Sequence, residues 1–220
     1  GLNGPSQISI APNGDLAVAN SGAGNVVVFP GASAAATPIT IPAASLAIAF
    51  DNAGNLWLAR PGTTGIQRYP APYAALNQTS AQSVSSPYSI AFDKDDNLFV
   101  ANAGNDTITE YSSVTYGTAP VHTASLSGVN NLTMASGALL VACTSSNSVT
   151  TYNTSLSNPQ TLPSGGTCHS AVDQTYNLWL SVKTSGYVVE YRFPYVAFDI
   201  VEQAQGLSQP VSLAVYPPSP

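Results

Sequence analysis

The stretches GDLAVAN (Gly14–Asn20) and DNLFVAN (Asp96–Asn102) are two copies of a segment that recurs along the whole chain. Related stretches are GNLWLAR from Gly54, GALLVAC from Gly137 and YNLWLSV from Tyr176. The first leucine of each stretch follows the previous one after about 40 residues, and these landmarks are Leu16, Leu56, Leu98, Leu139 and Leu178. A period of this length predicts a fold built from repeated supersecondary units.

Each repeat contains four short stretches with the alternation of β-strands. An apolar stretch precedes the landmark, as in IAFD from Ile90, and a third stretch follows it and ends in an aromatic residue, as in Ile108–Tyr111. A weaker fourth stretch is PITIP around Ile39, and turn dipeptides such as Asn13-Gly14 separate the stretches. The pattern predicts an all-β protein, a β-propeller of four-stranded antiparallel blades.

The expected organisation is a single β-propeller domain over residues 1–220. Its five full repeats give blades at approximately 4–42, 43–84, 85–128, 129–165 and 166–205, with an extra strand and tail at 206–220. The tail QPVSLAVYPP begins like a partial sixth repeat. We favour five blades. A six-bladed or larger ring remains open, as does a tail that completes a blade in a neighbouring copy.

One repeat carries a resemblance to a known family. The pattern Pro-x-x-Ile-Ala-Phe-Asp, then Asn-Leu-Phe-Val-Ala-Asn, then Ile-Thr-Glu-Tyr, from Pro87 to Tyr111, resembles an NHL repeat. The repeats that contain Trp57 and Trp179 are similar to those of streptogramin (virginiamycin B) lyase-like propellers. The resemblance covers about the whole chain and implies the β-propeller fold, which hosts lyases, lactonases and binding modules.

The same resemblance implies two kinds of metal chemistry, and the sequence departs from both. The lyase pattern implies a magnesium-assisted elimination by histidines and a glutamate on the channel face, where this chain offers only His169. Its glutamates, Glu110, Glu190 and Glu202, fall in third or fourth strands. A lactonase-like metal site needs acidic ligands beside the available asparagines, and neutral ligands alone bind a divalent cation poorly. We therefore expect no metal and no cofactor.

Composition excludes several classes of partner. Charged residues make up 7% of the chain and the net charge is −6, so neither nucleic acid nor an anionic membrane is an expected partner. No apolar run approaches the roughly 18 to 20 residues that span a bilayer. The Lys-poor chain with two cysteines favours a secreted protein, extracellular or periplasmic.

Cys143 and Cys168 are expected to form one structural disulfide, and a metal site or a nucleophilic thiol beside His169 is the alternative. Four sequons provide sites of N-glycosylation in a host that uses them, at Asn77, Asn105, Asn131 and Asn153. The acidic stretch DKDDN (Asp93–Asn97) is expected to be a solvated turn rather than a calcium loop.

Function is sought where second strands end and first strands begin, because both places lie on the face at which ligands enter a propeller channel. The candidate ligand-binding residues there are Gln7, Asn20, Arg60, Tyr88, Ser89, Asn102, Asn131 and His169. No residue is assigned a catalytic role in the favoured interpretation. His169 with Arg60 is the catalytic alternative, in which His169 acts as general base.

Three functions follow from these features. The first is a secreted, non-enzymatic binding or assembly module for a small polar ligand or a protein partner, since the channel face carries few titratable groups. The second is a lyase or a lactonase-type hydrolase centred on His169. The third is a self-assembling extracellular structural subunit that uses the C-terminal strand.

Overall fold

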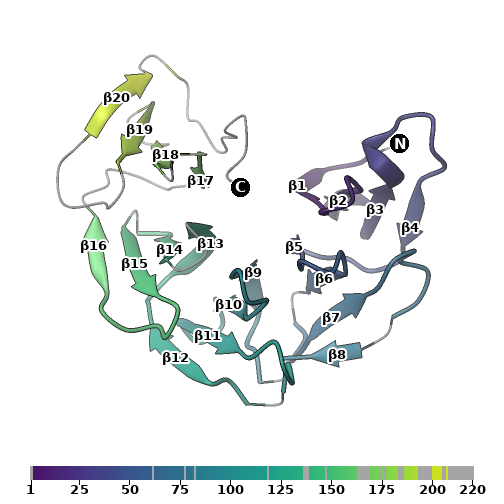
Figure 1. Ribbon diagram of the computed structural model, residues 1–220, viewed down its shortest axis with the longest axis horizontal. Helices are drawn as coiled ribbons and strands as arrows, with labels where there is room; N and C mark the ends of the chain where they lie inside the picture. The colour runs from purple at the N-terminus through teal and green to yellow at the C-terminus, as the bar shows by residue number, and fades with distance from the viewer. Residues whose placement is uncertain are drawn as a thin grey trace. The chain divides into compact units, whose positions relative to one another are not determined.

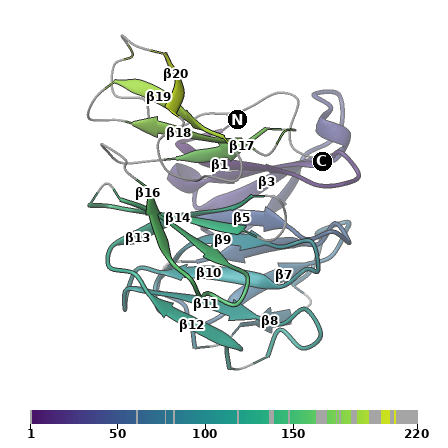
Figure 2. The ribbon, with the colours of Figure 1, turned by 60° about the vertical axis from the view of Figure 1, so that its left-hand side comes forward.

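The structure, a computed structural model, is an all-β, five-bladed β-propeller of four-stranded antiparallel sheets (Figures 1 and 2). It describes residues 2–60, 62–76, 78–81, 83–117, 119–135, 139–146, 148–162, 169–173, 175, 177–182, 186–192, 200–204 and 207. The predicted fold class and the favoured number of blades are confirmed. The partial sixth repeat, beyond Leu207, lies outside the described residues.

The first sheet contains β1 (Pro5–Ile10), β2 (Leu16–Asn20), β3 (Asn25–Phe29) and β4 (Ile39–Ile41), with the short 3-10 helices η1 (Ser21–Ala23) and η2 (Pro30–Ala32). The second contains β5 (Ala47–Phe50), β6 (Leu56–Ala59), β7 (Ile66–Tyr69) and β8 (Gln78–Ser80). The third contains β9 (Pro87–Phe92), β10 (Leu98–Asn102), β11 (Thr107–Tyr111) and β12 (His122–Ser125).

The fourth sheet contains β13 (Val129–Ala135), β14 (Leu139–Thr144), β15 (Val149–Asn153) and β16 (Gln160–Leu162). The fifth contains β17 (Ser170–Val172), β18 (Leu178–Val182), β19 (Tyr187–Tyr191) and β20 (Ile200–Ala204). In every sheet each strand pairs with the next one along the chain, so each sheet is a meander. Within the described residues, no helix is long and apolar enough to cross a bilayer.

The chain divides into two compact units, residues 1–105 with 109–123, and residues 106–108 with 124–220. In the first unit, small side chains of one blade pack against large side chains of the next. Ala17 and Ala19 of β2 leave room for Ile48 of β5, and Leu58 of β6 joins the same buried cluster. The aromatic residues that end the third strands, Tyr69, Tyr111, Tyr152 and Tyr191, are all buried, as their recurrence predicts.

The turn between first and second strands is held by an aspartate. Asp51 directly follows β5, and its Oδ1 accepts a hydrogen bond of 2.8 Å from the backbone N of Asn55, while its Oδ2 accepts 2.8 Å from Trp57 Nε1. Asp93 and Asp173 hold the corresponding turns through Asn97 and Asn177. The DKDDN stretch is therefore a turn, as expected, but its first carboxylate is buried rather than solvated.

The register of the fourth repeat differs from the expected one by one residue. Tyr152, the aromatic residue near the end of β15, pairs with Leu140, whereas Tyr69 and Tyr191 pair with the landmarks Leu56 and Leu178. Leu140 therefore occupies the landmark position that the sequence pattern gave to Leu139. The two adjacent leucines cannot be told apart by periodicity alone, because either one continues the alternation.

The first strand of blade one is covered differently from the two that follow it. Ile8 and Ile10 of β1 are 63% and 64% exposed. Ile48 of β5 and Ile90 of β9, at the position of Ile8, are only 1% and 4% exposed. Blades two and three each pack this position against the preceding blade. Within the first unit, Ile8 and Ile10 have no preceding blade against which to pack.

Candidate functional site

The asparagines that end two second strands are tied into their own blades. Asn20 Oδ1 accepts a hydrogen bond of 2.6 Å from the backbone N of Asn3, and Asn102 Oδ1 accepts one of 3.0 Å from the backbone N of Ser85. Both asparagines are 1% exposed. Each side chain fastens the segment that precedes its own first strand. Their predicted role in ligand binding remains a prediction.

Arg60 and Gln7 also make contacts within the first unit. Arg60 Nε donates to the carbonyl of Ala44 at 3.2 Å, and so fastens the second blade at the place where Asn20 and Asn102 fasten theirs. Gln7 Oε1 accepts 2.7 Å from the backbone N of Ile48, which links β1 to β5. These candidate residues therefore support the blades and their joints.

The remaining candidates are spread over both units. Tyr88 is 48% exposed on β9, and its neighbour Ser89 is buried. In the second unit, Asn131 Oδ1 accepts a hydrogen bond of 3.2 Å from Ser170 Oγ, which links β13 to β17. His169 is exposed, its backbone N donates to Ser181 Oγ, and desolvation lowers the pKa of its imidazole.

The predicted covalent sites are described only in part. Cys143 is buried in β14, and Cys168 lies outside the described residues, so the disulfide stays a prediction. Asn77 is likewise outside them. Asn105 is exposed, whereas Asn153 Oδ1 accepts hydrogen bonds from the N and Oγ of Ser157.

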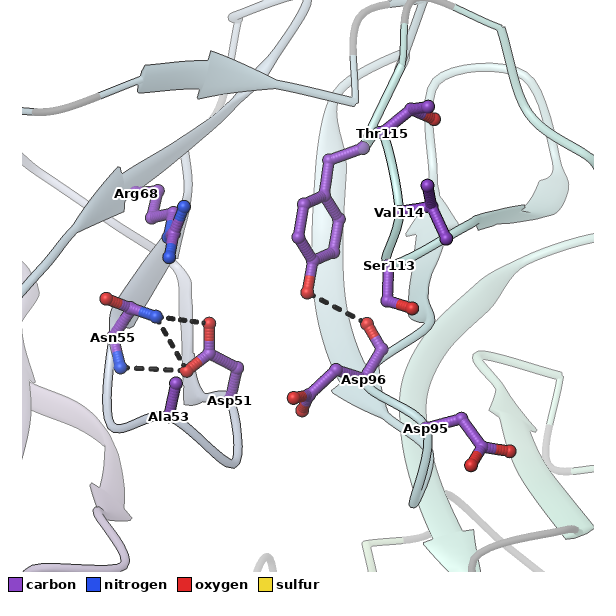
Figure 3. Close-up of a pocket in the computed structure, with 10 residues that line it drawn as sticks. Asp51, Ala53, Asn55, Arg68, Asp95, Asp96, Ser113, Val114 and Thr115 are labelled. Carbon is purple, nitrogen blue, oxygen red and sulfur yellow. Dashed lines mark hydrogen bonds between the residues drawn. The ribbon is translucent and has the colours of Figure 1, made fainter.

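A cleft of about 500 Å³ opens between the second and third blades, inside the first unit (Figure 3). It lies where the turns between first and second strands meet the loop after β11. Asp51 and Asn55 with Arg68 lie on one side, and Asp96 faces them from the other (Figure 3). The loop 113–115 and Tyr116 complete the lining, with Asp95 at the rim.

Arg68 is the cation of this cleft. Its Cζ lies 5.6 Å from the centre of the buried Trp57 ring, so the guanidinium is held by a cation–π contact. Its Nε is buried and has no hydrogen-bond acceptor among the residues that the structure describes. The two ion pairs found in that part of the chain are Lys94 with Asp95 and His122 with Glu110, so Arg68 has no carboxylate partner there.

The two principal carboxylates of the cleft differ in how they are satisfied. Asp51 is saturated by neutral donors, since Asn55 Nδ2 contacts both of its oxygens at 3.0 and 2.8 Å in addition to the two bonds described above. Asp96 Oδ1 accepts 2.8 Å from the backbone N of Asn52. Within the described residues, Asp96 Oδ2 accepts no hydrogen bond from the protein.

Burial raises the pKa of the Asp96 carboxyl above its usual value. The hydrogen bond from Asn52 opposes this shift, the negative charges of Asp51 and Asp93 add to it, and the charge of Arg68 opposes it. Asp96 also has a positive φ of 62°, a conformation that asparagine adopts as readily as aspartate. The carboxylate is thus held in a position that disfavours its charge.

The cleft exists because a tyrosine hydroxyl bridges blades one and two, whereas the corresponding hydroxyl does not bridge blades two and three. After β7, the Tyr73 hydroxyl donates a hydrogen bond of 2.9 Å to Asp15 Oδ2 of the preceding blade, and its oxygen lies 3.4 Å from Gly54 O in its own blade. After β11, Tyr116 donates to the carbonyl of Asp96 in its own blade at 3.0 Å. The residue that corresponds to Asp15 is Asn55, whose amide is turned to Asp51.

The sequence carries one signal for this site. The residue before the aromatic end of the third strand is Val28, Arg68, Glu110, Thr151 or Glu190 in the five repeats. Arg68 is the only cation at this position. The depth of the cleft, by contrast, depends on where the Tyr116 hydroxyl points, and no sequence pattern specifies that direction.

Neither a protein-family model nor a curated protein sequence matches this chain. Its fold is widespread among solved structures, since 1118 chains match it, and a fold so common does not by itself assign a function. A streptogramin B lyase structure is 12% identical with a TM-score of 0.76, and the match covers 96% of this chain and 72% of that one.

Two structures of virginiamycin B lyase from Staphylococcus aureus are similar as well. One matches with a TM-score of 0.70 at 12% identity, over 90% of this chain and 68% of that chain. The other is a catalytically inactive variant, in which a histidine is replaced by alanine, solved with quinupristin. It matches with a TM-score of 0.69 at 12% identity, over 87% of this chain and 68% of that chain. The chain therefore shares the β-propeller fold of these lyases.

Proposed function

We propose that this chain is a secreted, non-enzymatic binding module, and that the cleft around Arg68 holds its small polar ligand. The observation that carries the proposal is the guanidinium of Arg68, which lines the cleft and has no carboxylate partner among the described residues. Hydrogen bonds between a guanidinium and a carboxylate are charge-assisted and stronger than those between neutral groups. A ligand that brings a carboxylate to the guanidinium gives Arg68 this partner on binding.

Binding is favoured over chemistry at this cleft by the state of its titratable groups. Burial raises the pKa of Tyr116 to about 12, far above the pH at which a general acid or base works efficiently. The Asp51 carboxylate is already occupied by Asn55 and Trp57. The groups that remain open to a ligand, Arg68 and Asp96, are suited to fixed charge recognition.

Secretion is proposed from the two cysteines and the Lys-poor composition. The proposal is checked by the mass of the intact chain exported from a cell, measured before and after reduction. A gain equal to two hydrogen atoms on reduction is expected. The same mass in both states would contradict the Cys143–Cys168 disulfide and remove a main argument for export.

Ligand binding is tested through the fluorescence of Trp57, which lies beneath Arg68. The chain has two tryptophans, so a Trp179→Phe background leaves Trp57 as the only one. The probes are 4-aminobutanoate, butyrate, butylammonium and glucose. We expect at least one of them to change the emission of Trp57 saturably.

The matched variants are Arg68→Met and Arg192→Met, which remove the same charge at the cleft and at an exposed position in the second unit. The saturable change should disappear in the first variant and persist in the second. Binding that is unaffected by Arg68→Met, or no binding of any probe, would show that this cleft is not the site.

A second candidate function is a lyase centred on His169. It is favoured by the likeness to the two lyases, and desolvation of the His169 imidazole lowers its pKa, which increases the neutral fraction but makes it a weaker base. The test incubates the chain with quinupristin and follows the amount of intact quinupristin by liquid chromatography, because an elimination that opens a ring leaves the mass unchanged. Under the binding-module proposal quinupristin is not consumed. Consumption that is abolished by His169→Gln would establish the lyase instead.

A further inference from the structure

We infer that the ligand of the Arg68 cleft is a small zwitterion, whose carboxylate pairs with Arg68 and whose ammonium group lies at Asp96. This inference deepens the binding function proposed above and rests on it. It is argued from two unsatisfied groups of opposite charge on facing sides of one cleft (Figure 3).

The carboxylate end is specified by Arg68. A guanidinium presents parallel N–H donors that match the two oxygens of a carboxylate, and the Trp57 ring beneath it limits the directions in which it can point. The position of the charge is therefore fixed before a ligand arrives. A preorganised donor group of this kind loses little conformational entropy when the ligand binds.

The ammonium end is specified by Asp96. Its Oδ1 is occupied by the backbone N of Asn52, and its Oδ2 accepts no hydrogen bond from the described protein residues. An ammonium group is a donor only, with three N–H groups, and so it complements an open carboxylate oxygen. At the rim, Asp95 is already paired with Lys94 at 2.6 Å, which leaves Asp96 as the open carboxylate.

Ligands with a single charge fit the cleft less well. Its lining contains three carboxylates, those of Asp51, Asp95 and Asp96, against the one guanidinium of Arg68. A simple anion would pair with Arg68 but would be repelled by the carboxylates around it. A simple cation would be attracted by them but would be repelled by Arg68 and would leave its guanidinium without a carboxylate partner. A zwitterion satisfies both sides.

The identity of residue 96 supports the same conclusion. An asparagine would accept the hydrogen bond from Asn52 and would tolerate the positive φ, without placing a charge beside Asp51 and Asp93. The structural duties of this position do not require a carboxylate. Its negative charge is thus left for a partner that is not part of the protein.

The test is a series of ω-amino acids titrated against Trp57 fluorescence in the Trp179→Phe background. The series is glycine, β-alanine, 4-aminobutanoate and 6-aminohexanoate, and it spans increasing distances between the two charges. We expect affinity to peak at one chain length. Butyrate and butylammonium should bind at least about tenfold more weakly than the best zwitterion, since each lacks one charged hydrogen bond.

Two variants assign the ends of the ligand. Arg68→Met should abolish the preference for the zwitterion over butylammonium, and Asp96→Asn should abolish its preference over butyrate. Because Asp96→Asn is expected to stabilise the fold, weaker binding by this variant cannot be attributed to unfolding. Arg192→Met and Asp106→Asn are the controls, and neither should change the affinity.

Failure of the inference and failure of the binding function give different results. If butyrate, butylammonium or glucose binds as tightly as every zwitterion, and Arg68→Met abolishes that binding, the cleft is a binding site but its ligand is not a zwitterion. If no probe changes the emission of Trp57, both the inference and the proposed function are wrong. An affinity that does not vary along the series also contradicts a ligand held at both ends.

Discussion

Two tyrosines show how the contact made by a single hydroxyl determines whether the space between neighbouring blades is filled. The Tyr73 hydroxyl reaches Asp15 of the preceding blade, and burial with this contact raises the pKa of Tyr73 to about 12. The Tyr116 hydroxyl stays with the carbonyl of its own blade, and the Tyr116 ring packs against Trp57 at a centroid distance of 4.5 Å. The Tyr73 contact fills the space between blades one and two, and the Tyr116 contact leaves the cleft between blades two and three.

The two hydroxyls are predicted to differ in pH dependence. Tyr73→Phe removes a donor to a carboxylate and should lower the free energy of unfolding by about 1–2 kcal/mol at neutral pH. Desolvation raises the pKa of Asp15, but hydrogen bonds from Gly31 N, Asn13 and Tyr73 outweigh it and lower the pKa below 3.8. This stabilisation is therefore present above pH 3.8 and is lost as the pH falls through the folded-state pKa.

Urea unfolding across a pH series checks this expectation. Tyr116→Phe is the matched control, because its hydroxyl donates to a neutral carbonyl and its loss should cost about 1 kcal/mol at every pH. A penalty for Tyr73→Phe that does not fall at any pH below 3.8 at which the protein is still folded would show that the Asp15 carboxylate is not its cause.

Asp96→Asn is predicted to stabilise the unliganded protein at neutral pH, by less than about 1 kcal/mol because the side chain is only partly buried. The folded-state pKa of Asp96 is raised, so its ionisation weakens the fold as the pH rises through and beyond 3.8. The gain should vanish at lower pH, where the carboxyl is protonated in both states.

The control for this prediction is Asp106→Asn. Asp106 has a φ of 57°, and its Oδ1 accepts a backbone hydrogen bond from Gly128, but its side chain is exposed. Melting temperatures at neutral and acidic pH separate the two variants. Equal shifts in both would mean that the charge of Asp96 carries no particular penalty.

At the scale of the element, the side chain at the end of the second strand makes a structural hydrogen bond within its own blade. In three successive blades its side chain reaches the segment that precedes the first strand, at Asn3, Ala44 and Ser85. Asparagine does this by accepting from a backbone N–H, and arginine by donating to a carbonyl. The variable end of an otherwise uniform strand is thus explained by local hydrogen bonding.

Asn102→Ala is predicted to lower the free energy of unfolding by about 2 kcal/mol, because it removes the acceptor of the Ser85 backbone N–H and the amide that donates to Thr109 Oγ1. Arg60→Ala should cost less than about 0.5 kcal/mol, since its contact with Ala44 is exposed to water. Chemical denaturation measures both. Equal penalties would argue against burial as the reason for the difference.

The strands were predictable from sequence because alternate residues of each strand are buried, so apolar residues recur with a period of two. The register of blade four was not, since Leu139 and Leu140 fit the pattern equally well and only the pairing of Tyr152 decides between them. The cleft was missed for another reason. Arg68 is visible as an unusual residue, but the position of the Tyr116 hydroxyl that leaves room beside it follows from packing.

At the scale of the whole molecule, the protein is held together almost without charge. Charged residues make up 7% of the chain. Of the two ion pairs in the described residues, Lys94–Asp95 joins side chains that are 66% and 64% exposed. Such a pair contributes little in water. Packing between blades and the repeated hydrogen-bonded turns carry the stability.

The melting temperature is therefore predicted to be nearly independent of salt. Raising sodium chloride from about 0.05 M to about 0.5 M should shift it by less than about 3 °C. A small rise is the expected sign, because the net charge of −6 produces weak repulsion that salt screens. A fall of several degrees in calorimetry would reveal attractive charge pairs that the described residues do not contain.

The exposed isoleucines of β1 bear on how the protein behaves in concentrated solution. Exposed apolar side chains favour association between molecules unless surface charge keeps the molecules apart. Ile8 and Ile10 are 63% and 64% exposed, and the sparse surface charge supplies little repulsion between molecules. The substitutions Ile8→Thr and Ile10→Thr are therefore expected to raise solubility, and they leave the Arg68 cleft between blades two and three unchanged.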